Sequence, residues 1–269
     1  MKIHVAGISH IGNVRTSNED YFSIGAKVGQ KTPLQIVVDT NSPEFVSKGL
    51  LVAVADGMGG YAGGDLASRV MLESLTNAFT TTPLPRPNRM NAGDFVRVCL
   101  QTACDRVSNR LSKKADLSQG GTTIAGLALF APDIAVVFHA GDSRVLRVSG
   151  RFIRPLTVDH TPIGPMAAAG TITEDESVIA PEMKALERSI GAEGSNDPEV
   201  NHEQFWSPGD RFIICSDGLH GTGRGLTAHD LRTAAQEELD TIALAQRLVT
   251  EALGKGGKDN ITVVVLQVE

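Results

Sequence analysis

Four aspartates constrain the fold of this chain more than any other feature, because each stands at the end of an apolar run with the composition of a buried β-strand. They are Asp56, Asp142, Asp217 and Asp259. A single aspartate in such a position is commonly part of a hairpin turn. However, Asp142 and Asp259 are not followed by glycine, and the loops after the other two are longer than a two-residue turn needs. A shared site at one end of a sheet structure explains the set better.

Four carboxylates gathered in one place repel one another and raise one another's pKa values, so a cation is needed to neutralise them. Oxygen ligands without histidine or cysteine favour Mg²⁺ or Mn²⁺ over Zn²⁺. Arg15, five residues before Asp20, adds a planar cation that can bind phosphate through two N–H groups. Carboxylates, divalent metal ions and one arginine are the groups that two-metal hydrolysis of phosphate esters requires.

The spacing of apolar residues predicts a layered α+β protein. Helical spacing covers 65–79, 92–114, 226–235 and 241–253, and strand-like runs cover 2–8, 21–24, 49–55, 122–130, 134–139, 145–148, 152–155, 211–215 and 260–268. Short turns between successive strands favour antiparallel pairing. No repeat or linker divides the chain, so we expect residues 1–269 to form one domain, an antiparallel sheet sandwich flanked by helices.

Composition and charge argue against several classes of function. The formal net charge of −6 argues against nucleic acid as the main partner, because binding to a phosphate backbone needs a basic surface. The three cysteines have no C-x-x-C spacing, which favours reduced thiols over a disulfide framework or a zinc site. The most apolar stretch, 124–138, is interrupted by Pro132 and Asp133, and we find no secretory signal. We expect a cytoplasmic monomer without a membrane span.

The glycine-rich loop after Asp56 allows a competing interpretation. Gly57-x-Gly59-x-x-Ala62 satisfies the loose fingerprint of a dinucleotide-binding loop. Such a loop brings a pyrophosphate to a helix N-terminus, where the carboxylate of Asp56 would be an unfavourable neighbour. The fingerprint also needs an acidic residue at the end of a second strand about 20 residues on, and Glu73 lies in a helical pattern instead. The loop therefore fits a metal centre better than a nucleotide site.

Eight short segments, in order and spread over nearly the whole chain, resemble the motifs of the metal-dependent type 2C (PPM) serine/threonine protein phosphatases, particularly the bacterial branch. They lie at 12–22, 54–60, 121–123, 141–144, 156–160, 209–210, 215–219 and 258–262. The resemblance implies a four-layer α-β-β-α sandwich of two antiparallel sheets flanked by helices. It also implies two Mn²⁺ or Mg²⁺ ions between the sheets at one edge, and a third, weaker ion in bacterial members.

The resemblance further implies a role for each metal-binding residue of the core site. Asp56 would bridge the two ions, and the main-chain carbonyl of Gly57 would bind the second ion. Asp217 and Asp259 would complete the first ion. The close approach of the backbone to a metal explains why glycine follows Asp56.

Four more residues receive roles in the same way. Asp20 and Glu19 would act from the outer shell and orient water molecules on the second ion. Asp142, together with Asp217, would hold the third ion. Arg15 would bind the phosphate of the substrate.

The function implied is hydrolysis of phosphoserine and phosphothreonine in proteins by a metal-activated water, without a phosphoenzyme. The partners would be phosphorylated proteins and a counteracting serine/threonine kinase. Met58 occupies the position at which eukaryotic members carry a histidine proposed to protonate the leaving group, and a thioether cannot donate a proton. The general acid is therefore not identified, and neither is the physiological substrate.

Two alternatives remain open at this point. One is a pseudo-phosphatase that binds a partner without catalysis, although decayed members lose metal-binding aspartates and all five are present here. The other is a phosphatase for small phosphoesters. Two segments bear on substrate choice: a flap at about 161–187, and a longer than expected insertion at 26–48 that forms either an added strand or an exposed hairpin. His139 is expected to be a core residue, and His160 is not assigned a catalytic role.

Overall fold

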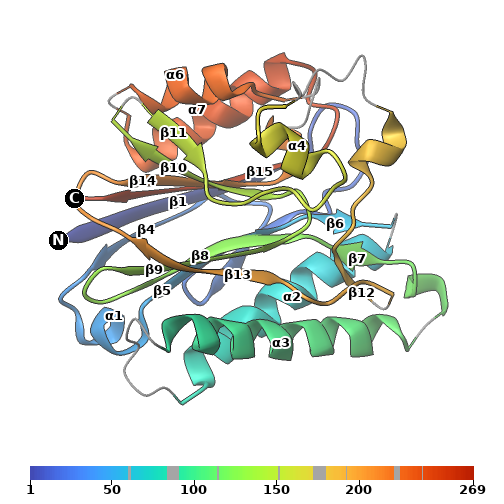
Figure 1. Cartoon of the computed structure of the whole chain (residues 1–269), viewed down its shortest axis with the longest axis horizontal. Helices are drawn as coiled ribbons and strands as arrows, with labels where there is room; N and C mark the ends of the chain where they lie inside the picture. Colours follow the sequence, from blue (N-terminus) through green and yellow to red (C-terminus); the bar gives the residue numbers. More distant parts are fainter. Residues whose placement is uncertain are drawn as a thin grey trace.

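The computed structural model of this chain describes residues 1–59, 62–83, 91–113, 115–150, 152–171, 180–191, 193–220, 225–237 and 239–269. Within them, two antiparallel six-stranded sheets lie face to face, and a pair of helices covers the outer face of each sheet (Figure 1). This arrangement confirms the four-layer α-β-β-α sandwich that the sequence predicted. None of the described helices is long and apolar enough to cross a membrane.

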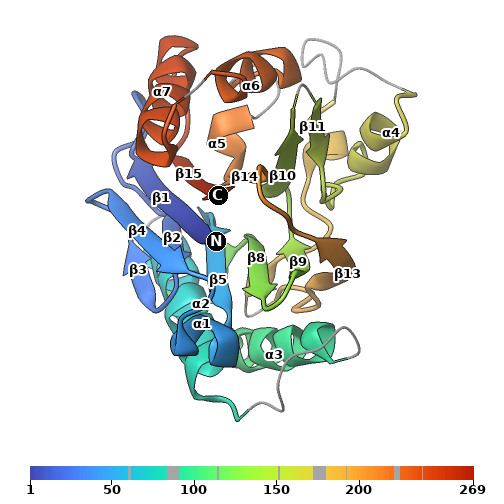
Figure 2. The same ribbon diagram turned by 90° about the vertical axis from the view of Figure 1, so that its left-hand side faces the viewer.

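The upper sheet in Figure 1 contains the first and the last strand of the chain. Its strands, in spatial order, are β11 (Phe152–Pro155), β10 (Arg144–Ser149), β14 (Arg211–Cys215), β15 (Ile261–Val268), β1 (Lys2–His10) and β4 (Leu34–Asp39). The helices α6 (Ala228–Ala235) and α7 (Thr241–Gly254) pack on its outer face. Figure 2 shows β1 and β15 side by side, with both chain ends near them.

The lower sheet is built from the middle of the chain. Its spatial order is β13 (Glu199–Phe205), β9 (Ile134–Ala140), β8 (Ile124–Phe130), β5 (Leu50–Ala55), β2 (Tyr21–Ile24) and β3 (Lys27–Gly29). It is covered by α2 (Ala62–Thr81) and α3 (Ala92–Leu111). A small third sheet joins β12 (Ile190–Gly191), β7 (Gly121–Thr122) and β6 (Gly57–Met58).

The position of β5 explains its unbroken apolar sequence. Val52 and Val54 face the interior of the sandwich, whereas Leu51 and Ala53 face the helices below. All four side chains are buried because β5 has a strand on each side and a layer on each face. Three apolar clusters, one between each pair of adjacent layers, hold the four layers together.

The insertion at 26–48 forms an added strand, one of the two predicted alternatives. β4 pairs antiparallel with β1 and extends the upper sheet by one strand. A short helix that we did not predict follows, α1 (Pro43–Lys48). Its first turn is capped by Ser42, whose Oγ accepts a hydrogen bond from the Phe45 main-chain N–H at 3.2 Å. The Phe45 ring packs edge-on against Trp206, with the ring centroids 6.0 Å apart.

Several predicted boundaries need correction. The strand predicted at 122–130 is interrupted at Thr123, whose backbone N–H bonds Asp56 instead of a neighbouring strand. The strand β13 was missed because its sequence is polar, as an edge strand permits. The helix predicted from 226 begins at 228, after the capping box formed by Thr227 and Asp230.

The predicted flap at 161–187 falls partly outside the described residues, which omit 172–179. The part that is described includes the short helix α4 (Gly164–Ala168) and a 3₁₀ turn at Pro181–Lys184. The Ile163 main-chain N–H donates to the Met183 carbonyl at 3.1 Å, so the two sides of the predicted flap are tied to each other.

Candidate metal centre and active site

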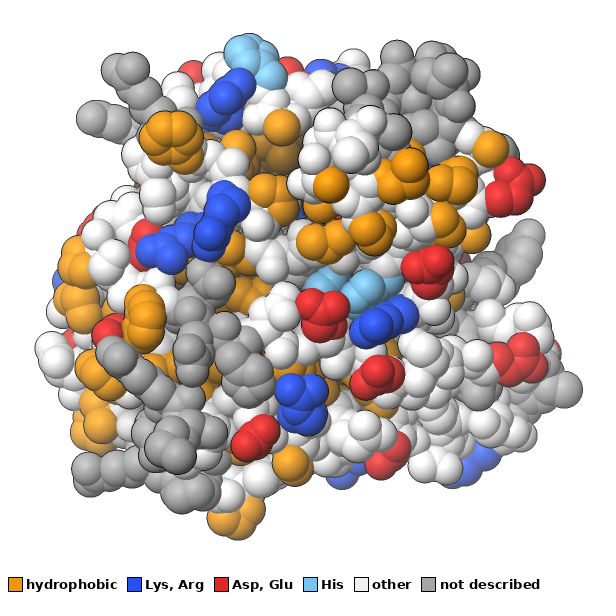
Figure 3. Space-filling model, viewed as in Figure 1, with side chains coloured by type: hydrophobic (Ala, Val, Ile, Leu, Met, Phe, Trp, Pro, Cys, Tyr) orange, Lys and Arg blue, Asp and Glu red, His pale blue; other side chains and the backbone are white. Residues whose placement is uncertain are grey.

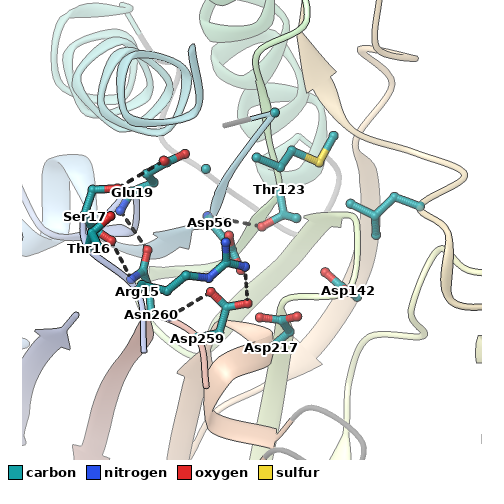
Figure 4. Close-up of a pocket in the computed structure, with 14 residues that line it drawn as sticks. Arg15, Thr16, Ser17, Glu19, Asp56, Thr123, Asp142, Asp217, Asp259 and Asn260 are labelled. Carbon is teal, nitrogen blue, oxygen red and sulfur yellow. Dashed lines mark hydrogen bonds and ion pairs between the residues drawn. The ribbon is translucent and has the colours of Figure 1, made fainter. Parts of the chain in front are cut away.

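The four aspartates come together where the ends of both sheets meet. Two follow strands of the lower sheet, β5 and β9, and two flank strands of the upper sheet, β14 and β15. All four line one pocket of about 420 Å³, in which their carboxylates lie near one another (Figure 4). They are Asp56, Asp142, Asp217 and Asp259. The structure thus places these residues in one site, as the sequence predicted, although they span more than 200 positions in the chain.

Main-chain hydrogen bonds fix the position of Asp56. Its carbonyl accepts from the Thr122 hydroxyl and from the Thr123 main-chain N–H, both at 2.9 Å, and its N–H donates to the Thr123 hydroxyl at 3.2 Å. The next residue is Gly57, and a Cβ there would lie 2.5 Å from the Gly64 carbonyl oxygen. Only glycine therefore allows the chain to turn away from the sheet at this point.

The electrostatics of the pocket favour the binding of a cation. Burial and the neighbouring carboxylates of Asp20 and Asp217 raise the pKa of Asp56 well above its ordinary value. Burial and Asp217 raise the pKa of Asp142 in the same way. Both shifts mean that the charged carboxylates are unfavourable in the protein alone. A divalent ion reverses this cost, and a donor set made of carboxylate oxygens fits Mg²⁺ or Mn²⁺.

Asp20 lies behind the pocket and does not line it. Its side chain is fully buried, and Oδ2 accepts a hydrogen bond from the Ser216 hydroxyl at 2.8 Å. Oδ1 is buried without a hydrogen-bond partner in the structure. Burial raises the pKa of this carboxyl to about 7. Asp20 thus lies close enough to Asp56 to raise its pKa, and its outer-shell role stays a prediction.

Glu19 and Arg15 reach the pocket from the loop between β1 and β2. The carboxylate of Glu19 lines it, and burial raises the pKa of this group. The Arg15 side chain is 56% exposed and forms an ion pair with Asp259, with 2.7 Å between Nη2 and Oδ2. The guanidinium therefore lies at the mouth of the pocket, beside Asp259 (Figure 4).

Asn260 also lines the pocket, and no role was predicted for it from the sequence. Its amide Nδ2 donates to the carbonyls of Ile11 and Ser17, both at 2.9 Å, and its Oδ1 accepts from the Glu19 main-chain N–H at 2.8 Å. One side chain thus holds the loop that carries Arg15 against the start of β15. Its place beside Asp259 in the motif at 258–262 was the available clue.

No histidine is among the residues described as lining the pocket. Met58 lines it but cannot donate a proton. His139, as predicted, is a core residue with no exposed surface. Leu186, from the predicted flap, is an apolar lining residue that sequence reasoning did not identify.

Comparison with known proteins agrees with the family resemblance of the sequence motifs and with the fold. The family model described as protein phosphatase 2C matches residues 41–255. The protein phosphatase PhpP of Streptococcus pneumoniae is 25% identical over 264 residues, covering 98% of this chain and 97% of its own. The serine/threonine phosphatase of S. agalactiae superposes with a TM-score of 0.80 at 27% identity, over 99% of this chain and 100% of its own.

A further solved structure carries metal. The catalytic domain of the serine/threonine protein phosphatase PstP, in complex with two manganese ions, superposes with a TM-score of 0.75 at 26% identity, over the whole of both chains.

Proposed function

The chain belongs to the protein phosphatase 2C family, and from this premise we propose how its residues divide the work of hydrolysing phosphoserine and phosphothreonine. Its relatives and structural neighbours are serine/threonine phosphatases, so the chain is an enzyme of this class. One observation carries the assignment of the site: four carboxylates from both sheets meet in a single pocket, and their mutual repulsion calls for cations.

In this proposal the aspartates hold the metal ions. Asp56 would serve both ions of the core site, the Gly57 carbonyl would bind the second, and Asp217 and Asp259 would bind the first. When bound, the ions supply a hydroxide nucleophile near neutral pH and positive charge for the phosphoryl oxygens. Mn²⁺ and Mg²⁺ are the two candidates, because the donor set selects hard ions without separating these two.

The remaining residues position the substrate and support the ligands. Arg15 binds two phosphoryl oxygens through its guanidinium fork. Glu19 and Asp20 would orient water molecules on the second ion, and Asp142 with Asp217 would hold a third, weaker ion. The proton for the leaving serine or threonine oxygen comes from water or from another residue, because Met58 offers none.

The cellular setting follows from the same class of reaction. We infer a single-domain cytoplasmic monomer whose substrates are phosphorylated by a serine/threonine kinase. The three cysteines are free and buried, as in proteins of a reducing compartment. A phosphatase for small phosphoesters would use the same chemistry, and a pseudo-phosphatase would use the same fold. The complete set of aspartates favours catalysis over the latter.

The test is a phosphopeptide assay with Mn²⁺, Mg²⁺ or chelator on the wild type and on Asp56→Asn and Asp217→Asn. Both variants should lose metal-dependent hydrolysis, because each removes a charged ligand. Asp94→Asn, an exposed carboxylate in the first turn of α3, is the matched control and should keep full activity. Full activity in either site variant would overturn the site assignment. Turnover of small phosphoesters but not of phosphopeptides would overturn the substrate class.

A further inference from the structure

The motif L-T-V-D-H at 156–160 lies outside the metal centre, yet it is tied along its length to the strand end that carries Asp142. The two segments run antiparallel, and several hydrogen bonds join them, among them one from the Val145 main-chain N–H to the Thr157 hydroxyl at 3.1 Å. The Leu156 main-chain N–H donates to the Val145 carbonyl at 2.8 Å, and His139 Nε2 donates to the Val158 carbonyl at 2.8 Å. The Arg144 guanidinium and the Asp159 carboxylate form a bidentate pair at 2.8 and 2.7 Å. At the end of the motif, His160 forms hydrogen bonds with Gly141.

His160 closes this series next to the candidate metal ligand. Its Nδ1 accepts a hydrogen bond from the Gly141 main-chain N–H at 3.2 Å, and its own main-chain N–H donates to the Gly141 carbonyl at 3.0 Å. One residue thus satisfies both backbone groups of Gly141. Because Nδ1 accepts, the neutral ring carries its proton on Nε2, which donates to Glu199 at 3.3 Å.

The backbone at Gly141 is tightly constrained, which limits where the next residue, Asp142, can lie. Its φ angle is +106°, and a Cβ at this position would lie 2.6 Å from the Thr123 methyl group. The peptide that leads into Asp142 is therefore held by packing on one side and by His160 on the other. A shift of His160 would move the backbone from which the Asp142 carboxylate extends into the pocket.

The same histidine is joined to the predicted flap. The Glu187 main-chain N–H donates to the His160 carbonyl at 2.8 Å, and the preceding residue, Leu186, lines the pocket. Glu199, the partner of the ring, is the first residue of β13 and pairs with His139 across the strands. His160 therefore connects the Asp142 loop, the end of the predicted flap and the lower sheet.

The side chains of His139, His160 and Glu199 also offer ligand atoms within 4.8 Å of one another, which raises the question of a second metal site. The ring geometry argues against it. The two imidazoles stack at 4.2 Å with only 16° between their planes, so their in-plane lone pairs run nearly parallel and do not converge on one point. In addition, the Nδ1 lone pair of His160 is used by Gly141. The three residues His139, His160 and Glu199 are better explained as a structural support for the loop that carries Asp142, which we call the brace.

We propose that His160 is a positioning residue that sets the place of the Asp142 carboxylate and of Leu186 at the pocket wall. His139 supports the flat face of its ring, and Glu199 holds its Nε2 proton. On the side shown in Figure 3, histidine atoms reach the surface between acidic and basic side chains, below the apolar area over α4. Only 11% of the His160 side chain is exposed, as expected for a brace rather than a surface residue.

The proposal rests on the role proposed for Asp142, and a pair of isosteric variants tests it. In His160→Asn, the side-chain oxygen takes the place of Nδ1 and keeps the acceptor for Gly141. In His160→Gln, the amide nitrogen takes the place of Nε2 and the acceptor for Gly141 is lost. Both variants lose the ring that stacks on His139, so their stability should fall alike. They differ in the contact that each keeps: His160→Asn keeps the one with Gly141, and His160→Gln keeps the one with Glu199.

The readout is Mn²⁺ binding, measured by titration calorimetry without substrate. We expect His160→Gln to weaken the weakest Mn²⁺ binding step about tenfold, the lower end of the loss seen when an outer partner of a metal ligand is removed. His160→Asn should stay within about twofold of the wild type on the same scale. Equal affinities in the two variants, or equal losses that follow their melting temperatures, would overturn the positioning role.

A double-mutant cycle with Asp142→Asn completes the test. If His160 acts through Asp142, His160→Gln should add nothing to the loss that Asp142→Asn causes alone. Losses that add, or an Asp142→Asn variant that binds Mn²⁺ as the wild type does, would overturn the proposal. Because no substrate is present, a wild-type protein without phosphatase activity would contradict the proposed function and leave this result standing.

Discussion

Arg15 Nη2 lies 2.7 Å from Asp259 Oδ2, so the proposed phosphate-binding group and a proposed metal ligand neutralise each other. The hydrogen bond that Arg15 donates to Asp259 is the main cause of the raised Arg15 pKa. The arginine is more than half exposed, and such a pair contributes about 0–1 kcal/mol. The Arg15–Asp259 ion pair is therefore weak enough to break when a cation binds the Asp259 carboxylate. The guanidinium of Arg15 would then be available to bind phosphate.

The first prediction follows from this pair. Arg15→Ala should raise KM for a phosphopeptide about tenfold, because a charged hydrogen-bond donor to the phosphate is lost. It should also bind Mn²⁺ as tightly as the wild type or up to about fivefold more tightly, since Asp259 no longer has a competing partner. Steady-state kinetics and calorimetry measure the two effects separately. Weaker Mn²⁺ binding in Arg15→Ala would contradict the competition.

A second prediction compares two glycines with nearly the same backbone conformation. Gly12 has φ +82° and Gly209 has φ +89°. A Cβ at Gly12 would lie 2.1 Å from the Asp259 carbonyl oxygen, whereas at Gly209 nothing lies within 4 Å. Gly209→Ala should cost only the conformational penalty of about 1–2 kcal/mol. Gly12→Ala should cost clearly more and should also weaken Mn²⁺ binding, because the backbone of Asp259 has to move.

Denaturant unfolding and Mn²⁺ titration of the two glycine variants check this. Gly209→Ala serves as the matched control for the unfavourable φ angle. Any further loss of stability in Gly12→Ala is then due to the clash with the Asp259 carbonyl. Equal stabilities would show that the loop at Gly12 moves away without cost.

How far the fold could be predicted depends on how strongly each element is determined by its own residues. β5 was predicted almost to the residue because burial on both faces leaves an unbroken apolar run. β13 was not predicted, since its pairing with β9 comes from the backbone and its side chains are largely polar. The helix α1 begins at a Ser-Pro pair that is equally typical of a turn, and its stability depends on Phe45 meeting Trp206.

The same distinction applies to the site. The aspartates could be identified because strand ends at one edge of a sandwich must be neighbours, and because the motifs resemble a known family. The contacts that set the environment of these aspartates could not be identified from the sequence. Asp20 meets Ser216 across 196 positions in sequence, and Arg15 meets Asp259 across 244. No local pattern encodes which distant residues will face each other, so the brace at His160 and the support from Asn260 emerged only from the structure.

A third prediction concerns Asn260. Asn260→Asp would remove two hydrogen bonds to the carbonyls of Ile11 and Ser17 and add a negative charge beside Asp259. We expect a loss of about 3 kcal/mol in the free energy of unfolding, since two acceptors lose their partners. KM for the phosphopeptide should rise as well, because the loop carrying Arg15 is released. Asn41→Asp, at an exposed position in the insertion, is the control and should be nearly neutral.

The last prediction concerns the dependence of stability on pH in the metal-free protein. Burial raises the pKa of Asp20 from 3.8 to about 7. Between these values the folded protein holds a proton that the unfolded chain has released, so the free energy of unfolding should fall as pH rises from about 4 to about 7. The pKa values of Asp56 and Asp142 are raised in the same direction and add to this slope. The change attributable to Asp20 alone is at most about 4 kcal/mol.

Asp20→Asn isolates this contribution, because the amide keeps the acceptor for Ser216 and does not titrate. Unfolding can be followed through Trp206, which is 2% exposed, packs against Phe45 and is the sole tryptophan. In metal-free buffer the variant should lose less stability than the wild type between pH 4 and 7. Saturating Mg²⁺ should reduce the difference, since a nearby cation favours the charged carboxylate. The same pH slope in both proteins without metal would show that Asp20 is ionised in the folded state, and that the pocket tolerates its full charge without a cation.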